Sequence, residues 1–192
     1  MQKLFRKEVL LMMIFITGGS ASGKSRIAEK LCKKSETGKL YYIATMKVWD
    51  DECRKRIEKH RFQRRNKGFV TVEMPDTIEK CRDIITDEKS TALVECIGNL
   101  LANEQFDIMS ENPAEKIIHG ISELYKSVEN LVIVSDEVFS DGNIYSPEMN
   151  EYIRNMGKIN SALAEMSDIA AEAVCGIPVV MKGRELYNEI AD

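Results

Sequence analysis

An apolar run that leads directly into a glycine-rich loop is the feature that most restricts how this chain can fold. Residues 9–16 are all apolar, and residues 18–25 read GGSASGKS. The loop matches the pattern G-x4-G-K-[ST] in full, and it lies between a predicted strand and a predicted helix, as the pattern requires. Glycines in such a loop let backbone N–H groups surround phosphate oxygens, and the helix N-terminus adds a partial positive charge. A chance glycine–serine turn would not explain the pattern and its context together.

Two polar side chains of this loop have predicted roles on a bound nucleotide. Lys24 is expected to reach the outer phosphates as a catalytic point charge, and the Ser25 hydroxyl is expected to ligate Mg²⁺. The predicted phosphate-binding residues are Gly18, Gly19, Ser20, Ala21, Ser22, Gly23, Lys24 and Ser25.

A site of this kind usually has a carboxylate near the metal, at the end of a neighbouring strand. Glu95 ends the segment ALVE, and Asp136 and Glu137 follow the segment LVIVS. Each acid could instead be a solvated residue at a strand end. We assign Glu95 together with Ser25 to the Mg²⁺ site and keep Asp136 and Glu137 as alternatives.

Apolar runs alternate with amphipathic stretches along the chain. Strands are predicted at residues 9–17, 40–44, 69–73, 92–96, 131–134 and 178–181, and helices at 24–34, 47–64, 76–86, 113–127, 147–166 and 184–190. Residues 169–174 fit either a helix or a strand. This alternation predicts an α/β fold of the P-loop NTPase type, with a mostly parallel central sheet flanked by helices. We expect one domain over residues 1–192, with a flexible extension over residues 1 to about 8.

Composition excludes several classes of protein. The 27 basic and 31 acidic side chains give a net charge of −4, which argues against nucleic acid as a partner. The chain has five cysteines, none of them in a C-x-x-C pair, and two histidines, so a zinc site has little support and free thiols in a cytoplasmic protein fit best. The apolar run at residues 9–16 is too short for a membrane span, which takes about 20 residues.

One histidine lies in an unusually basic helical segment. His60 is surrounded by Arg56, Arg61, Arg64 and Arg65. The arginines could neutralise phosphates and help to keep the imidazole uncharged, which is its nucleophilic form. The alternative is an ordinary helix histidine on a solvated basic face, and spacing alone favours that alternative.

The sequence resembles a known family, the bifunctional adenosylcobinamide kinase / adenosylcobinamide-phosphate guanylyltransferases. The resemblance covers nearly the whole chain from about residue 12, and its motifs occur in the family's order. They are TGGSASGKSRIAE (17–29), YYIAT (41–45), Asp50-Asp51-Glu52, Arg56-Ile57-x-x-His60-x-x-x-Arg64, Thr71-Val72-Glu73, Leu93-Val94-Glu95-Cys96, Val134-Ser135-Asp136-Glu137-Val138, Arg154-x-x-Gly157-x-x-Asn160 and Gly176-Ile177-Pro178. The phosphate loop occurs in many enzymes, whereas the R-I-x-x-H-x-x-x-R block is far more specific.

The resemblance implies two activities in cobalamin biosynthesis. A kinase step would move the γ-phosphate of ATP or GTP to the aminopropanol hydroxyl of adenosylcobinamide, a corrinoid. In a transferase step, the histidine that corresponds to His60 would attack GTP, and GMP would then pass to adenosylcobinamide phosphate. The nucleotide contacts that the resemblance adds to the loop are Thr45, Met46, Lys47, Arg61, Phe62, Gln63, Arg64, Glu73 and Glu95. The resemblance also implies a homotrimer.

Four departures from the family pattern leave other functions open. Ala21 stands where the family commonly has arginine, Asp136 where it has asparagine, and Phe69 where tryptophan is usual; the glycine-rich turn has become the segment 139–142. The first alternative is a P-loop kinase for another small molecule, without the transferase step. The second is a nucleotide-binding regulator that performs no transfer.

Overall fold

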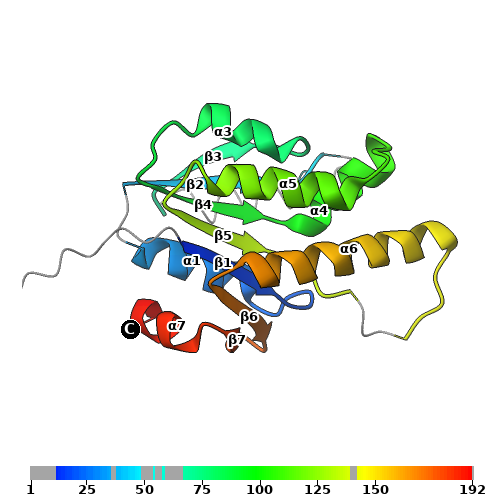
Figure 1. The fold of residues 1–192 in the computed structure, drawn as a ribbon. Helices are drawn as coiled ribbons and strands as arrows, with labels where there is room; N and C mark the ends of the chain where they lie inside the picture. Colours follow the sequence, from blue (N-terminus) through cyan, green and yellow to red (C-terminus); the bar gives the residue numbers. More distant parts are fainter. Residues whose placement is uncertain are drawn as a thin grey trace, which may run out of the picture.

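A computed structural model describes residues 12–35, 38–48, 54, 58, 67–138 and 142–191. In these residues seven strands form one sheet, in the order β3-β2-β4-β5-β1-β6-β7 (Figure 1). The strands are β1 (Met12–Thr17), β2 (Lys39–Ala44), β3 (Phe69–Glu73), β4 (Ser90–Glu95), β5 (Asn130–Val134), β6 (Ile169–Val174) and β7 (Ile177–Lys182). Neighbouring strands are parallel, except that β7 runs antiparallel to β6. The predicted mostly parallel sheet is confirmed.

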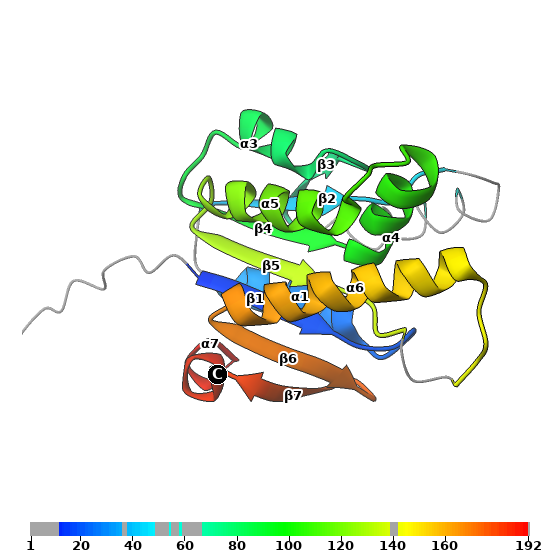
Figure 2. The same cartoon turned by 45° about the vertical axis from the view of Figure 1, so that its right-hand side comes forward.

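Helices cover both faces of this sheet (Figures 1 and 2). The α-helices with defined bounds are α1 (Lys24–Lys34), α3 (Cys81–Ile84), α4 (Ile97–Ala102), α5 (Pro113–Tyr125), α6 (Pro147–Met166) and α7 (Arg184–Ala191). A 3₁₀ turn, η1 (Ile78–Lys80), precedes α3, and a π-helical turn, η2 (Asn103–Asp107), follows α4. Since successive strand residues point to opposite faces, Met13 and Phe15 of β1 pack in the core under α5 and α6, whereas Ile14 and Ile16 pack in the core under α1.

The order of the strands explains where a site can form. Strands β4, β5 and β1 are adjacent and parallel, so their carboxyl ends lie at the same edge of the sheet. The segments that follow these strands begin at Cys96, Ser135 and Gly18, and the fold therefore brings them together. Ligands of open α/β sheets bind in the crevice outside the carboxyl ends of the strands.

One predicted helix differs from the structure, one ambiguous segment is decided by it, and two elements were not predicted. The helix predicted at 76–86 is only η1 and the short α3, because Ile85 is already extended (φ −89°, ψ 93°). The ambiguous segment 169–174 is strand β6, which lies buried between β1 and β7. Helix α4 and the turn η2 were not predicted, although the spacing of Ile97, Leu100 and Leu101 fits one buried helical face.

Several predictions fall partly outside the described residues. These include the extension at residues 1 to about 8, residues 9–11 of the first predicted strand, and most of the helix predicted at 47–64. Lys47 and Val48 are not helical, so that helix was predicted to begin too early, whereas Arg54 and Glu58 are helical. None of the helices in the described part of the chain has the length and apolar character needed to cross a bilayer.

Candidate nucleotide-binding site

The phosphate loop connects β1 to α1, and its glycines are required by close packing. Gly18 and Gly23 have positive φ angles of 155° and 92°. A Cβ atom on Gly18 would lie 2.7 Å from the Ser22 hydroxyl and 2.8 Å from the carbonyl oxygen of Ala173. A Cβ atom on Gly23 would lie 3.0 Å from Cα of Gly176. Neither position has room for a larger residue, so the loop can follow this tight path only with glycine there.

The turn between β6 and β7 supports the loop from one side, which the sequence pattern did not indicate. The Gly176 N–H donates to the carbonyl oxygen of Ser22 at 2.8 Å. From the other side, the Glu137 N–H after β5 donates to the carbonyl oxygen of Gly18 at 3.1 Å. The loop is therefore held by two segments that lie far from it in the sequence.

Lys24 is the first residue of α1, and its side chain folds back across the loop. Its ammonium group donates to the carbonyl oxygen of Gly19 at 3.0 Å and forms an ion pair with Asp136 Oδ1 at 2.9 Å. The Lys24 side chain is only 11% exposed. The positive charge thus lies inside the loop, where the outer phosphates of a nucleotide are expected.

The structure brings together the two predicted Mg²⁺ ligands. The Ser25 hydroxyl donates a hydrogen bond to Oε1 of Glu95, the last residue of β4. Mg²⁺ prefers oxygen ligands, and in such sites one or two protein side chains hold it together with substrate phosphates. The Ser25–Glu95 pair therefore fits a magnesium ion that arrives with the nucleotide.

The alternative acid, Asp136, faces Lys24 and not Ser25. Its Oδ2 accepts a hydrogen bond from the Cys96 thiol at 3.2 Å. Burial raises the pKa of the Cys96 thiol well above its ordinary value, and the Asp136 carboxylate raises it further, so the thiol keeps its proton and acts as the donor. Cys96 had not been predicted as part of the site, although it directly follows Glu95.

The other predicted contacts in the described residues lie at the ends of β2 and β3, at the same edge of the sheet. Thr45 is fully buried, and its hydroxyl donates to the carbonyl oxygen of Cys96 at 2.7 Å. Lys47 forms ion pairs with Asp107 and, at 3.7 Å, with Asp76. The hydrogen bond that Lys47 donates to Asp107 and the nearby carboxylates raise the pKa of Lys47, so this side chain remains a cation.

Two more of the predicted contacts are Met46 and Glu73. Met46, between Thr45 and Lys47, is half-buried, and Glu73 at the end of β3 is exposed. Strands β4 and β5 separate β2 from β1 in the sheet. Residues 45–47 and 73 thus border the crevice at some distance from the phosphate loop.

Comparison with known proteins identifies the family. Residues 14–181 match the family described as cobinamide kinase / cobinamide phosphate guanyltransferase. This chain belongs to that family. It is 29% identical over 185 residues to the bifunctional adenosylcobalamin biosynthesis protein CobU of Escherichia coli (strain K12), an alignment that covers 89% of this chain and all of the relative. The protein of the same name from Salmonella typhimurium is 30% identical over 188 residues, again covering 89% of this chain and all of the relative.

A solved structure supports the fold alone. An ATPase from the type III secretion system of pathogenic bacteria superposes with a TM-score of 0.51 and 12% sequence identity, over 93% of this chain and 58% of that one. This likeness, together with the loop geometry, confirms the predicted P-loop type of fold.

The most specific motif of the family lies outside the described residues. The residues of this segment that the structure does not describe include Arg56, Ile57, His60, Arg61, Phe62, Gln63 and Arg64. The role predicted for His60 therefore remains a prediction from sequence. The other histidine of the chain, His119, is exposed on α5.

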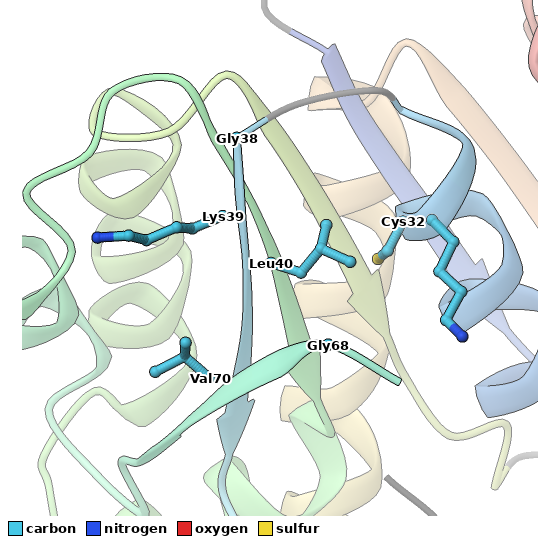
Figure 3. A pocket seen from close by; sticks show the side chains of 7 residues that line it. Cys32, Gly38, Lys39, Leu40, Gly68 and Val70 are labelled. Atoms are coloured by element: carbon cyan, nitrogen blue, oxygen red, sulfur yellow. The ribbon is translucent and has the colours of Figure 1, made fainter. Parts of the chain in front are cut away.

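A cavity of about 270 Å³ lies away from these residues (Figure 3). Cys32 and Lys33 near the end of α1, residues 38–40 at the start of β2, and Gly68 and Val70 line it. These positions are at the amino ends of the strands, opposite the phosphate loop. The family's nucleotide chemistry is therefore not expected in this cavity.

Proposed function

We propose that this protein phosphorylates adenosylcobinamide and then transfers GMP to the product. The observation that carries the kinase step is that Lys24 and Ser25 of the phosphate loop lie with Glu95, at the end of β4, in a chain that belongs to this family. The aminopropanol hydroxyl attacks the γ-phosphorus of ATP or GTP. A new O–P bond forms, the bond between the γ-phosphorus and the bridging oxygen breaks, the nucleoside diphosphate leaves, and the hydroxyl proton is released to solvent.

The residues of this chain act on that step mainly through charge and position. The loop N–H groups and the Lys24 ammonium group stabilise negative charge on the transferring phosphoryl group. Ser25 and Glu95 would hold Mg²⁺, which when bound supplies further positive charge beside the phosphate oxygens. No covalent intermediate with the protein is needed for the kinase step.

The transferase step is proposed to run through His60. The imidazole attacks the α-phosphorus of GTP, a P–N bond forms, the bond from the α-phosphorus to the oxygen that bridges it to the β-phosphate breaks, and pyrophosphate leaves. The phosphate group of adenosylcobinamide phosphate then attacks the same phosphorus, the P–N bond breaks, and the imidazole is released. The support for this step is that the R-I-x-x-H-x-x-x-R block of this chain resembles that of the family. The resemblance to the family also supports nucleotide contacts by residues 45–47, 61–64 and 73.

Product analysis tests the proposed function against its alternatives. The purified protein is incubated with adenosylcobinamide, Mg²⁺ and either ATP or GTP, and the corrinoids are identified by mass spectrometry. We expect adenosylcobinamide phosphate first and then its GMP adduct, the latter only when GTP is present. The phosphate without the adduct would favour a small-molecule kinase, and neither product would favour a nucleotide-binding regulator.

The Glu95→Gln variant tests the proposed Mg²⁺ site. The amide keeps the size of the side chain but loses the charge that attracts the cation, so we expect the Mg²⁺ concentration for half-maximal kinase activity to rise about tenfold. Metal-free nucleotide binding should change much less. Mg²⁺ titrations of activity, beside binding measurements in EDTA, check this. An unchanged Mg²⁺ requirement and rate would remove Glu95 from the site.

We also propose that the protein is a cytoplasmic homotrimer with one domain per chain. Family resemblance supports the trimer, and strand β7 offers an apolar surface for self-association. Ile177, Val179 and Met181 alternate along this edge strand and are 66%, 46% and 60% exposed. Analytical ultracentrifugation should give three times the 21.8 kDa mass of the chain. A 21.8 kDa particle at all concentrations would contradict the proposal.

A further inference from the structure

The ammonium group that should bind phosphate is already neutralised by a carboxylate. Lys24 Nζ lies 2.9 Å from Asp136 Oδ1, at the end of β5, and the two side chains are 11% and 31% exposed. Because the Lys24 ammonium group is largely shielded from water, its attraction to Asp136 is screened less than the attraction within an ion pair on the surface. The outer phosphates of a nucleotide must therefore compete with Asp136 for the same cation.

Asp136 is held in place from several sides. The Cys96 thiol donates to its other carboxylate oxygen at 3.2 Å, and Asn160 Nδ2 of α6 donates to its backbone carbonyl at 3.2 Å. The Asn160 side chain is itself fixed, because the Ser135 hydroxyl donates to its Oδ1 at 2.6 Å. On the remaining side, Gly98 approaches so closely that a Cβ atom there would lie 2.4 Å from Asp136 Oδ2.

These contacts restrict what can move when a nucleotide arrives. The Asp136 backbone and both carboxylate oxygens are engaged, whereas the Lys24 side chain has four rotatable carbon–carbon bonds and can turn toward a phosphate. After that turn the fixed carboxylate would remain beside the newly bound phosphates. It would then repel them, and it would attract Lys24 back when they leave.

We propose that Asp136 is a positioning residue that holds the Lys24 ammonium group in the empty loop and weakens the binding of nucleoside triphosphates by competing with their outer phosphates for it. This inference rests on the proposed function, in which the loop binds a triphosphate. The carboxylate costs affinity and in return favours release of the nucleotide product, because the Lys24–Asp136 ion pair re-forms.

The test is the affinity of the Asp136→Asn protein for nucleotides with different numbers of phosphates. Asparagine keeps the size and an oxygen that can accept from Lys24, but it removes the charge. In EDTA and at constant ionic strength, calorimetry should give a dissociation constant for GTP about tenfold lower than that of the wild type. The gain should be smaller for GDP and absent for GMP, because it depends on the outer phosphates. A purely structural effect would change all three alike and would contradict the proposal.

Three further variants complete the design. Asp83→Asn makes the same change in net charge on exposed α3 and should leave all three affinities unchanged. Asp136→Glu keeps the charge and should bind GTP no more tightly than the wild type. When Lys24 is replaced by alanine, Asp136→Asn removes only the repulsion between the carboxylate and the phosphates, so its gain in GTP binding should differ from the gain in the wild type; equal gains in the two backgrounds would mean that Asp136 does not act through Lys24.

The outcomes separate this inference from the proposed function. If the wild type binds GTP but Asp136→Asn binds it no more tightly, the inference fails and the nucleotide site stands. If Asp136→Asn instead loses Mg²⁺-dependent binding without any gain in EDTA, Asp136 is a metal ligand and the inference also fails. If the wild type binds no nucleotide at all, it is the proposed function that fails.

Discussion

Replacing Lys24 by alanine should lower kinase kcat/KM by about 10³-fold. The physical reason is the loss of the one ammonium group inside the loop, which stabilises charge on the transferring phosphoryl group. The change also leaves the Asp136 carboxylate without its counter-ion, facing the phosphates. Initial rates of adenosylcobinamide phosphorylation, measured beside a circular-dichroism melt, check this prediction.

A matched control lies on the same helix. Lys30 is exposed on α1, and Lys30→Ala removes an identical charge from that helix away from the loop. We expect this variant to keep nearly the full rate. If Lys24→Ala also kept its turnover, the loop would not be the phosphoryl-transfer site.

Replacing His60 by alanine should abolish covalent labelling of the protein by GTP that is labelled at the α-phosphate. Imidazole has an unperturbed pKa of about 6.5, so it is mostly neutral near pH 7 and can attack without a separate base. The P–N bond of the labelled protein should be labile to acid and stable to alkali, unlike a serine phosphodiester. GTP labelled at the γ-phosphate should not label the protein by this route. Phosphorylation of the corrinoid should persist in the variant, because that step depends on the loop and the metal.

The chain offers a matched control for this experiment too. It has two histidines, and His119 is exposed on α5. His119→Ala should therefore keep both the label and the kinase activity. Undiminished α-label on His60→Ala protein would refute the assignment, and loss of both activities in a folded variant would mean that His60 is structural.

Much of the fold could be predicted because its signals are local. Apolar periodicity and helix-start residues such as Pro147 predict strand β3 and helices α1 and α6. They also predict the approximate positions of the other parallel strands. The short segments were harder. Residues 169–174 are apolar enough for either a strand or a buried helix, and only their place between β1 and β7 made them a strand.

The site divides in the same way. The phosphate loop is encoded in eight consecutive residues, because the turn, the lysine and the helix N-terminus that bind phosphate are all contiguous in the chain. Acids at two strand ends could also be recognised as candidates. Their roles could not be separated, because a strand-end position does not say which neighbouring side chain the carboxylate meets.

The sequence by itself determined that this chain has a phosphate loop in a mostly parallel α/β sheet and that it resembles the cobinamide kinase / guanyltransferase family. Only the tertiary structure decided that Glu95 meets Ser25 while Asp136 meets Lys24 and Cys96, and that the β6–β7 turn packs against the loop. These pairings join residues up to about 150 positions apart. They depend on the order of β4, β5, β1 and β6 in the sheet, and packing of the whole core, not any local pattern, sets that order.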